Sequence, residues 1–272
     1  MLHSSMPRSI FQLRSHIVSL VRYRELLLIL AISDFKTRHR QTILGILWTL
    51  VQPVSMMLVA TLIFAVFVKV PVTGMPYLLF AYTGILSWVF FANSLSNGFP
   101  SIVGNMNLVT KVKFPREVIP LAKILVACFD FLIGIAVLII LMFAYGVNIT
   151  RAVMLTPFIL MIHVFLTVGF VFWGSAAYVL KRDLGSLLPV VLQLWMFLSP
   201  VMYPAAVIPA EYQKIYFLNP IAAVIEAYRS ILFLGVPPSL GLILPAFSIS
   251  TLVLLSGFIY FKSVEPRFAD VM

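Results

Sequence analysis

The chain has 272 residues, of which 62% are hydrophobic and only 10% are charged, and its mean hydropathy is +1.08. Soluble domains carry roughly 25% charged residues, so this composition excludes a water-soluble globular protein. The net charge of +10 does not indicate nucleic-acid binding, because most basic residues stand before or between apolar segments. In a membrane protein, residues in such places set orientation and meet anionic lipid headgroups. We therefore expect membrane lipids as partners and no nucleic acid.

The N-terminal region predicts an interface helix. Residues 17–32 are apolar enough to bind a membrane but carry Arg22, Arg24 and Glu25 near their centre. Three charges at the centre of a bilayer would be costly, whereas an amphipathic helix can lie at the interface with its charges in water. We expect this helix within a cytoplasmic segment over residues 1–42.

Six segments are long and apolar enough to cross the roughly 30 Å hydrocarbon core of a bilayer. The fifth is interrupted by Pro189, Pro200 and Pro204, which favours a kinked helix whose freed backbone groups are satisfied by neighbours. The expected fold class is an all-α polytopic membrane protein with six transmembrane helices. The predicted spans are 43–68, 77–99, 124–147, 152–180, 186–204 and 240–261, in a transmembrane domain over 43–262 with a cytoplasmic tail over 263–272.

The stretch between the fifth and sixth spans is neither a plain loop nor a span. Residues 205–235 hold two short helical patterns separated at Asn219-Pro220, with Glu226 and Arg229 on the second. Two short amphipathic helices at membrane depth, re-entrant or forming a gate, fit this pattern best.

The distribution of basic residues predicts the orientation. With six spans and cytoplasmic termini, 15 of the 19 Lys and Arg residues fall on the inner side, and 19 − 15 = 4 fall outside. This is a clear positive-inside bias.

The sequence offers no enzyme motif. It contains no phosphate loop, no H-E-x-x-H and no G-x-S-x-G, so we expect no catalytic, cofactor or metal site. Asp130 is the one carboxylate deep in a predicted span and must be neutralised there. Lys123 lies two helical turns earlier on roughly the same face; alternatively, Asp130 meets a hydroxyl or a cation on another helix, or lies nearer the membrane interface. His163, within a span, is interpreted as a packing residue.

Aromatic residues at the span ends have two interpretations. They form an interfacial belt, or some of them face a passage and stack on a sugar ring. Trp48 and Trp195 each precede a proline by five residues, and Tyr203, Tyr212 and Tyr216 stand beside the predicted outer helices.

The inner segment 105–123 is amphipathic and basic, and its prolines make it rigid. A rigid segment can transmit a push from a docked partner. Its charges also suit a simple positive-inside anchor.

Five motifs, taken in order, resemble the membrane subunit of type-2 ABC exporters. The branch most similar exports lipid-linked polysaccharides: O-antigen, capsule and teichoic acid. The motifs are RHRQTILGILWTLVQP (38–53), LVTKVKFPREVIP (108–120), KRDLG (181–185), SPVMYP (199–204) followed by IP, and NPIAAVIEAYRSIL (219–232).

The resemblance implies a homodimer that binds two copies of a separate cytoplasmic ATPase, which holds the ATP and Mg. It also implies two groups of site residues. Candidates for ATPase coupling or lipid-headgroup contact are Asp34, Phe35, Arg38, Arg40, Lys111, Lys113, Phe114 and Arg116; candidates for the translocation path or outer gate are Trp48, Trp195, Tyr203, Tyr212, Tyr216, Glu226 and Arg229. The basic run before the first span would meet the phosphates of a lipid-pyrophosphate carrier, although anionic membrane lipids would select the same residues.

The function expected from this resemblance is ATP-driven export of a lipid-linked polysaccharide, O-antigen first, across the bacterial plasma (inner) membrane. One alternative is a type-2 ABC exporter of a small molecule or drug. Another is an integral membrane enzyme or a proton-coupled transporter centred on Asp130.

Overall fold

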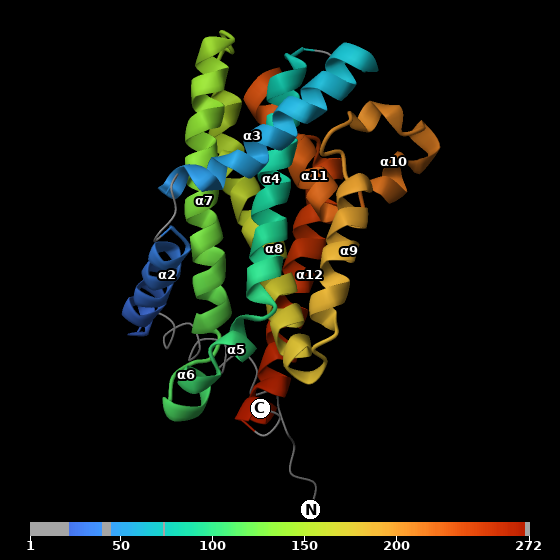
Figure 1. The fold of residues 1–272 in the computed structure, drawn as a ribbon. Helices are drawn as coiled ribbons and strands as arrows, with labels where there is room; N and C mark the ends of the chain where they lie inside the picture. Colours follow the sequence, from blue (N-terminus) through green and yellow to red (C-terminus); the bar gives the residue numbers. More distant parts are fainter. Residues whose placement is uncertain (1–21, 40–44, 73, 270–272) are drawn as a thin grey trace, which may run out of the picture.

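A computed structural model describes residues 22–39, 45–72 and 74–269, and within these ranges every regular element is helical (Figure 1). The principal helices are α2 (Arg24–His39), α3 (Trp48–Ala60), α4 (Tyr77–Gly98), α5 (Ser101–Gly104), α6 (Met106–Lys111), α7 (Val118–Ala144), α8 (Thr156–Leu180), α9 (Leu184–Phe197), α10 (Ala210–Tyr216), α11 (Pro220–Arg229) and α12 (Leu240–Val264). Short 3₁₀ or π-helical turns extend several of them, including Gly45–Leu47, Thr61–Phe67, Arg151–Leu155, Ala205–Val207, Ser230–Leu234 and Glu265–Ala269.

Within the described residues, five helical stretches are long and apolar enough to cross a bilayer, or six when a bent pair is counted. The bent pair is Ala210–Tyr216 with Pro220–Leu234, and the helix direction changes by 109° between its two parts. The all-α polytopic class is thereby confirmed. The five stretches are Gly45–Phe67, Tyr77–Gly98, Val118–Ala144, Arg151–Leu180 and Leu240–Phe268.

The fifth predicted span is shorter than expected. The helix there, α9, has 14 residues and ends at Phe197 instead of 204, so it rises only about 21 Å. The chain leaves helical geometry because Pro200 has no N–H and disfavours helical geometry at the residue before it. Residues 198–204 form a turn that leads to α10.

The third helix begins earlier than expected, at Val118 instead of 124. Pro120 therefore lies in its first turn, where backbone N–H groups have no partner within the helix and a missing one costs nothing. The rigid inner segment is correspondingly shorter, and consists of α6 and the turns up to Glu117.

Helix α4 lies in the centre of the bundle, between α3, α7 and α8 (Figure 1). Most of α4 is buried, whereas α3 crosses its outer side and is largely exposed. Helices α8 and α12 run in the same direction and make the most extensive helix pair. They approach closely because Gly169 faces Gly257: a Cβ on Gly257 would lie 2.3 Å from the carbonyl oxygen of Gly169. Such small-residue contacts are typical of helix pairs in membranes.

The two ends of the bundle differ. Helices α5 and α6 and the end of α12 gather at one end, and the bent α10–α11 pair lies toward the other (Figure 1). Helix α2 lies against the half of α7 nearer α6. This arrangement separates the two groups of predicted site residues.

Candidate functional site

Helix α2 is fixed to α7 by two ion pairs. The ammonium of Lys123 donates to Asp34 at 2.6 Å, and Arg38 Nη1 donates to Asp130 Oδ2 at 2.7 Å. Small apolar contacts lie beside them, with Ala31 packed against the α7 residues Ala122 and Val126. Asp130 thus meets a cation on another helix, one of the arrangements that the sequence left open.

The signs of these charges alternate along the contact. From its N-terminal side, α2 offers an acid and then a base, while α7 offers a base and then an acid. A slip by one helical turn would bring Arg38 to Lys123, or Asp34 to Asp130, and like charges in a poorly solvated place repel strongly. The paired charges therefore specify one register for α2 on α7.

Two neighbours of this contact were also predicted site residues. The ring of Phe35 lies 6.1 Å from that of Phe129 on α7, so it belongs to the same packed contact. Trp48, at the start of α3, is half exposed and lines a cavity next to Arg38. Arg40 lies outside the described residues.

The inner segment is tied to the end of α12. Arg116 Nη1 donates to the carbonyl oxygen of Glu265 at 2.5 Å, and Lys262 donates to Glu117 at 2.7 Å and to Glu265 at 2.9 Å. Glu117 is completely buried. Arg116 is thus used inside the chain, which fixes the segment to the C-terminal turn.

The exposed part of this segment is its tip. Lys111 and Lys113 are exposed, with Val112 between them, whereas Phe114 is half-buried against an apolar cluster. The tip presents two ammonium groups on a rigidly held turn. Sequence reasoning missed Glu117 and Lys262; the only signal was that Glu117 is the single acid in 105–123.

In the turn after α9, other donors replace the helical hydrogen bonds to the backbone carbonyls. All six carbonyls from Phe197 to Met202 accept a hydrogen bond. Side chains supply five of these bonds, and the backbone N–H of Val201 supplies the sixth, to Ser199. The side-chain donors are Tyr203 to Phe197 (2.9 Å), Asn219 to Leu198 (3.3 Å), Arg229 to Pro200 (2.6 Å) and Val201 (2.9 Å), and Tyr77 to Met202 (2.5 Å).

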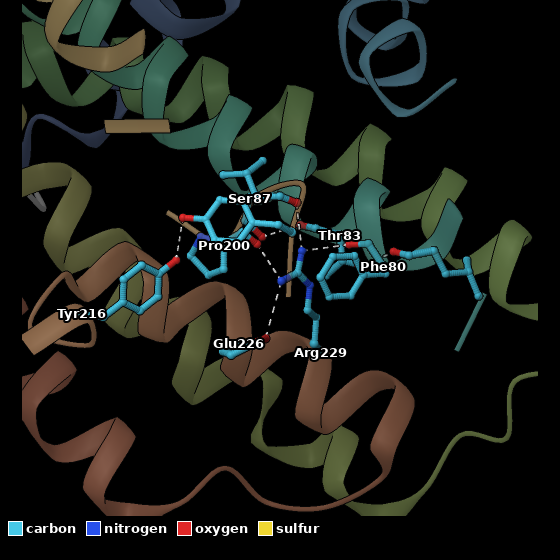
Figure 2. A network of polar contacts seen from close by, with 10 residues as sticks. Phe80, Thr83, Ser87, Pro200, Tyr216, Glu226 and Arg229 are labelled. Carbon is cyan, nitrogen blue, oxygen red and sulfur yellow. Dashed lines mark hydrogen bonds and ion pairs between the residues drawn. The ribbon is translucent and has the colours of Figure 1, made fainter. Parts of the chain in front are cut away.

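Arg229 is the centre of this arrangement (Figure 2). Its guanidinium is only 2% exposed and also donates to the carbonyl oxygen of Phe80 on α4 at 3.1 Å. The guanidinium carbon lies 3.4 Å from the centre of the Phe80 ring, and Glu226 lies 3.5 Å away as a counter-charge. One planar cation therefore joins α11, the turn and α4, a task that suits the fixed fork of arginine.

Gly84 makes room for this contact. A Cβ at Gly84 would lie 2.3 Å from the carbonyl oxygen of Val201 and 2.6 Å from Arg229 Nη2. Any larger residue would push the turn away from α4. No local feature of the sequence marks Phe80 or Gly84 as a neighbour of Arg229, because both lie about 150 residues before it.

Most of the other residues predicted to line the translocation path make hydrogen bonds within the chain. Trp195 packs edge-on against Phe91 and Phe170 and donates its indole N–H to Asn219 at 3.0 Å. The hydroxyls of Tyr203 and Tyr216 lie 3.1 Å apart. Tyr212 is exposed on α10. Of these residues, Tyr212 alone has an exposed ring at the surface of the bent α10–α11 pair.

His163 is a packing residue. It is completely buried, and its ring lies edge-on to Phe90 with centroids 4.8 Å apart. No group of three or more His, Cys, Asp or Glu residues that could hold a metal occurs in the described ranges.

Comparison with known proteins identifies the family. The model of the ABC-2 type transporter family matches residues 25–233, from α2 to the end of the bent pair. The O-antigen export system permease protein RfbA of Myxococcus xanthus is 30% identical over 253 residues, which cover 92% of this chain and 96% of that protein. A protein of the same name from Klebsiella pneumoniae is 27% identical over 249 residues, with 91% and 95% covered. The polysialic acid transport protein KpsM of Escherichia coli is 24% identical over 220 residues, with 76% and 80% covered.

The α2–α7 charge pairs predict a rescue by charge exchange. Lys123→Asp places two carboxylates together and should cost about 1–2 kcal/mol, a fall in Tm of about 5 °C. Adding Asp34→Lys restores an attractive pair and should recover most of the loss in thermal unfolding of the purified protein. Lys36→Asp, on the exposed side of α2, is the matched control and should change Tm little. A double variant no more stable than Lys123→Asp alone would contradict the pairing.

The three carbonyl contacts of Arg229 predict that this residue cannot be replaced by another cation. Arg229→Lys keeps the charge but leaves buried carbonyls without donors, and should cost about 3 kcal/mol in the free energy of unfolding. Arg151→Lys, at an exposed position, should cost almost nothing.

Gly84→Ala should be similarly destabilising and should add little to Arg229→Lys, because both changes release the same turn. Gly241→Ala has no atom within 4 Å of its new methyl and is the control. Full additivity of the Gly84 and Arg229 changes would argue against a shared contact.

Proposed function

The chain belongs to the membrane subunits of ABC-2 type transporters, and from this premise we propose that it exports a lipid-linked polysaccharide, O-antigen in the first place, across the bacterial plasma membrane. It is a multi-pass transmembrane subunit, and its family implies a partner ATPase. The observation that carries the choice of cargo is the end-to-end similarity to permeases named for O-antigen export, with 92% of this chain and 96% of one relative covered.

The proposed assembly contains two copies of this chain and two copies of a cytoplasmic ATPase that binds ATP and Mg. Both termini face the cytoplasm in this proposal. The excess of basic residues on the inner segments supports that orientation. So does the position of α6 and the end of α12 at one end of the bundle, opposite the bent pair.

The predicted site residues take two roles. Lys111 and Lys113 at the inner tip contact the ATPase, while Arg116 and Phe114 hold the tip in place. Asp34, Phe35 and Arg38 keep α2 on α7, and Arg40 remains a predicted headgroup contact.

The outer group forms the gate. Four of its residues fix the bent α10–α11 pair: Arg229, Glu226, Tyr203 and Tyr216. The exposed ring of Tyr212 meets the emerging glycan. Trp48 and Trp195 are the proposed aromatic contacts along the path, on different sides of α4.

The carboxylate of Asp130 pairs with Arg38 at 2.7 Å and so helps to hold α2 on α7, a structural role that argues against a proton-coupled mechanism centred on it. This observation favours an energy source in a partner chain.

Deletion of this chain tests the cargo. Surface glycan should disappear, and lipid-linked glycan should accumulate on the inner side of the plasma membrane, as measured by extraction and by accessibility to an added glycosidase in inverted vesicles. The chain supplied together with its ATPase should restore export, and the same chain with a hydrolysis-deficient ATPase should not. Normal surface glycan in the deletion strain, with retention of a small molecule instead, would support the drug-exporter alternative.

The inner tip predicts a defect in coupling. Lys111→Glu with Lys113→Glu should reduce co-purification of the ATPase and glycolipid-stimulated ATP hydrolysis about tenfold, because two attractive contacts become repulsive. Insertion and thermal stability should be preserved, since both side chains are exposed. Lys69→Glu is the matched control, because Lys69 is exposed and belongs to the connection between α3 and α4, which lies at the end of the bundle opposite α6 (Figure 1). An undiminished complex in the double variant would remove the tip from the ATPase interface.

A further inference from the structure

A polar cavity lies where α2, α3, α4 and α7 meet. It has a volume of about 290 Å³, close to the lower end of small-molecule sites at roughly 300 Å³. Asp130, one of its lining residues, is 12 residues into α7 (118 to 130), or about 18 Å along the helix. The polar lining consists of Arg38, Trp48, Thr49, Gln52, Asn93 and Asp130.

Two of the lining groups are not used by the fold. The carboxamides of Gln52 and Asn93 make no hydrogen bond within the described part of the chain. Each carboxamide offers two N–H donors and one oxygen acceptor. Polar amides at this depth, facing a cavity and not the bundle core, favour a ligand that can both donate and accept.

The charge of the cavity is balanced. Arg38 Nη1 donates to Asp130 at 2.7 Å, so the pair adds little net charge, and the other N–H groups of the guanidinium can donate to a phosphate or a hydroxyl. Trp48, half exposed beside the pair, adds a flat apolar face with an N–H at its edge. Amides, a balanced ion pair and an indole together suit the hydroxyls and the apolar ring face of a neutral sugar.

A second cavity adjoins the first. It has a volume of about 260 Å³ and shares Leu86 and Phe131 with the polar cavity. Its other lining residues are mostly aliphatic, among them Ile135, Leu138 and Met142 on α7. One molecule with a polar ring and a hydrocarbon chain would fit the pair of cavities, whereas a free sugar would leave the second empty.

We infer that the polar cavity binds the first, lipid-proximal hexose of a glycolipid, with the hydrocarbon chain along the apolar cavity. Gln52 and Asn93 hydrogen-bond the ring hydroxyls, and Trp48 stacks on the ring. The cavity holds one ring, so it recognises the lipid-proximal sugar independently of the length of the glycan. This inference rests on the proposed function and names the part of the cargo that the permease recognises.

The test uses the complex of the full chain with its ATPase in nanodiscs of uncharged lipid. The probes are farnesyl diphosphate carrying one hexose and farnesyl diphosphate alone. The wild type should bind the glycosylated probe about tenfold more tightly, the size expected for one or two hydrogen bonds. In Gln52→Leu and Asn93→Leu this ratio should fall to about one, while binding of the bare probe stays the same.

Asn97→Leu is the matched control. Asn97 is on the same helix and donates to the backbone carbonyl oxygen of Asn93, but it does not line the cavity, so its variant should keep the tenfold ratio. Gln52 is exposed, so its variant folds even if Asn93→Leu does not.

Two results would overturn the inference. Equal binding of both probes by the wild type would mean that the phosphates alone are recognised. A ratio that Gln52→Leu and Asn93→Leu leave unchanged would place sugar recognition elsewhere. Either result, with surface glycan still lost in the deletion strain, would leave the proposed export function intact.

Discussion

The structure depends on satisfying backbone carbonyls where the chain stops being helical at membrane depth. Lipid offers no hydrogen bonds, so irregular backbone survives there only when protein groups replace water. Between Phe197 and Met202 every carbonyl has a donor, and Arg229 alone serves two of them together with Phe80 of α4. The guanidinium is the reason that α9 can end early and the chain can turn into the bent pair. Without it, several unpaired carbonyls would each cost about 1–3 kcal/mol.

The opposite end is fixed by charge, and the two ends share a continuous set of contacts. The inner tip continues directly into α7, which is one helix of 27 residues. Helix α7 carries α2 through its ion pairs and packs along α4. Helix α4 in turn provides Phe80 and Gly84, against which Arg229 and the turn are seated. A displacement of α7 at the tip thus acts on α4, the helix against which the bent α10–α11 pair is held.

Hydropathy predicted the helices well because length and apolarity are properties of one segment, independent of its neighbours. The expected segment 77–99 corresponds to helix Tyr77–Gly98 for that reason. The contacts between segments were harder to predict. Nothing local marks Lys123 as the partner of Asp34, or three carbonyl oxygens as the partners of Arg229, because backbone acceptors leave no trace in the sequence. The end of α9 at Phe197 was missed because proline was expected only to kink the helix. Here the helix ends completely, because side-chain donors satisfy the carbonyls that the helix would have paired.

The nine acidic residues explain how so basic a chain tolerates charges among its helices. Five of them, Asp34, Glu117, Asp130, Glu226 and Glu265, form ion pairs with Lys or Arg in the described ranges. Four of the five cation–acid contacts involve an acid or a base that is at most 19% exposed, and the fifth involves Lys123 at 21%. Acids are thus used mainly to neutralise cations that the fold needs where water is scarce. The basic residues left over, such as Lys111 and Lys113, have no such constraint and are exposed. In the described ranges the excess positive charge therefore lies mainly at the surface, available to anionic lipids and to an acidic surface on a partner.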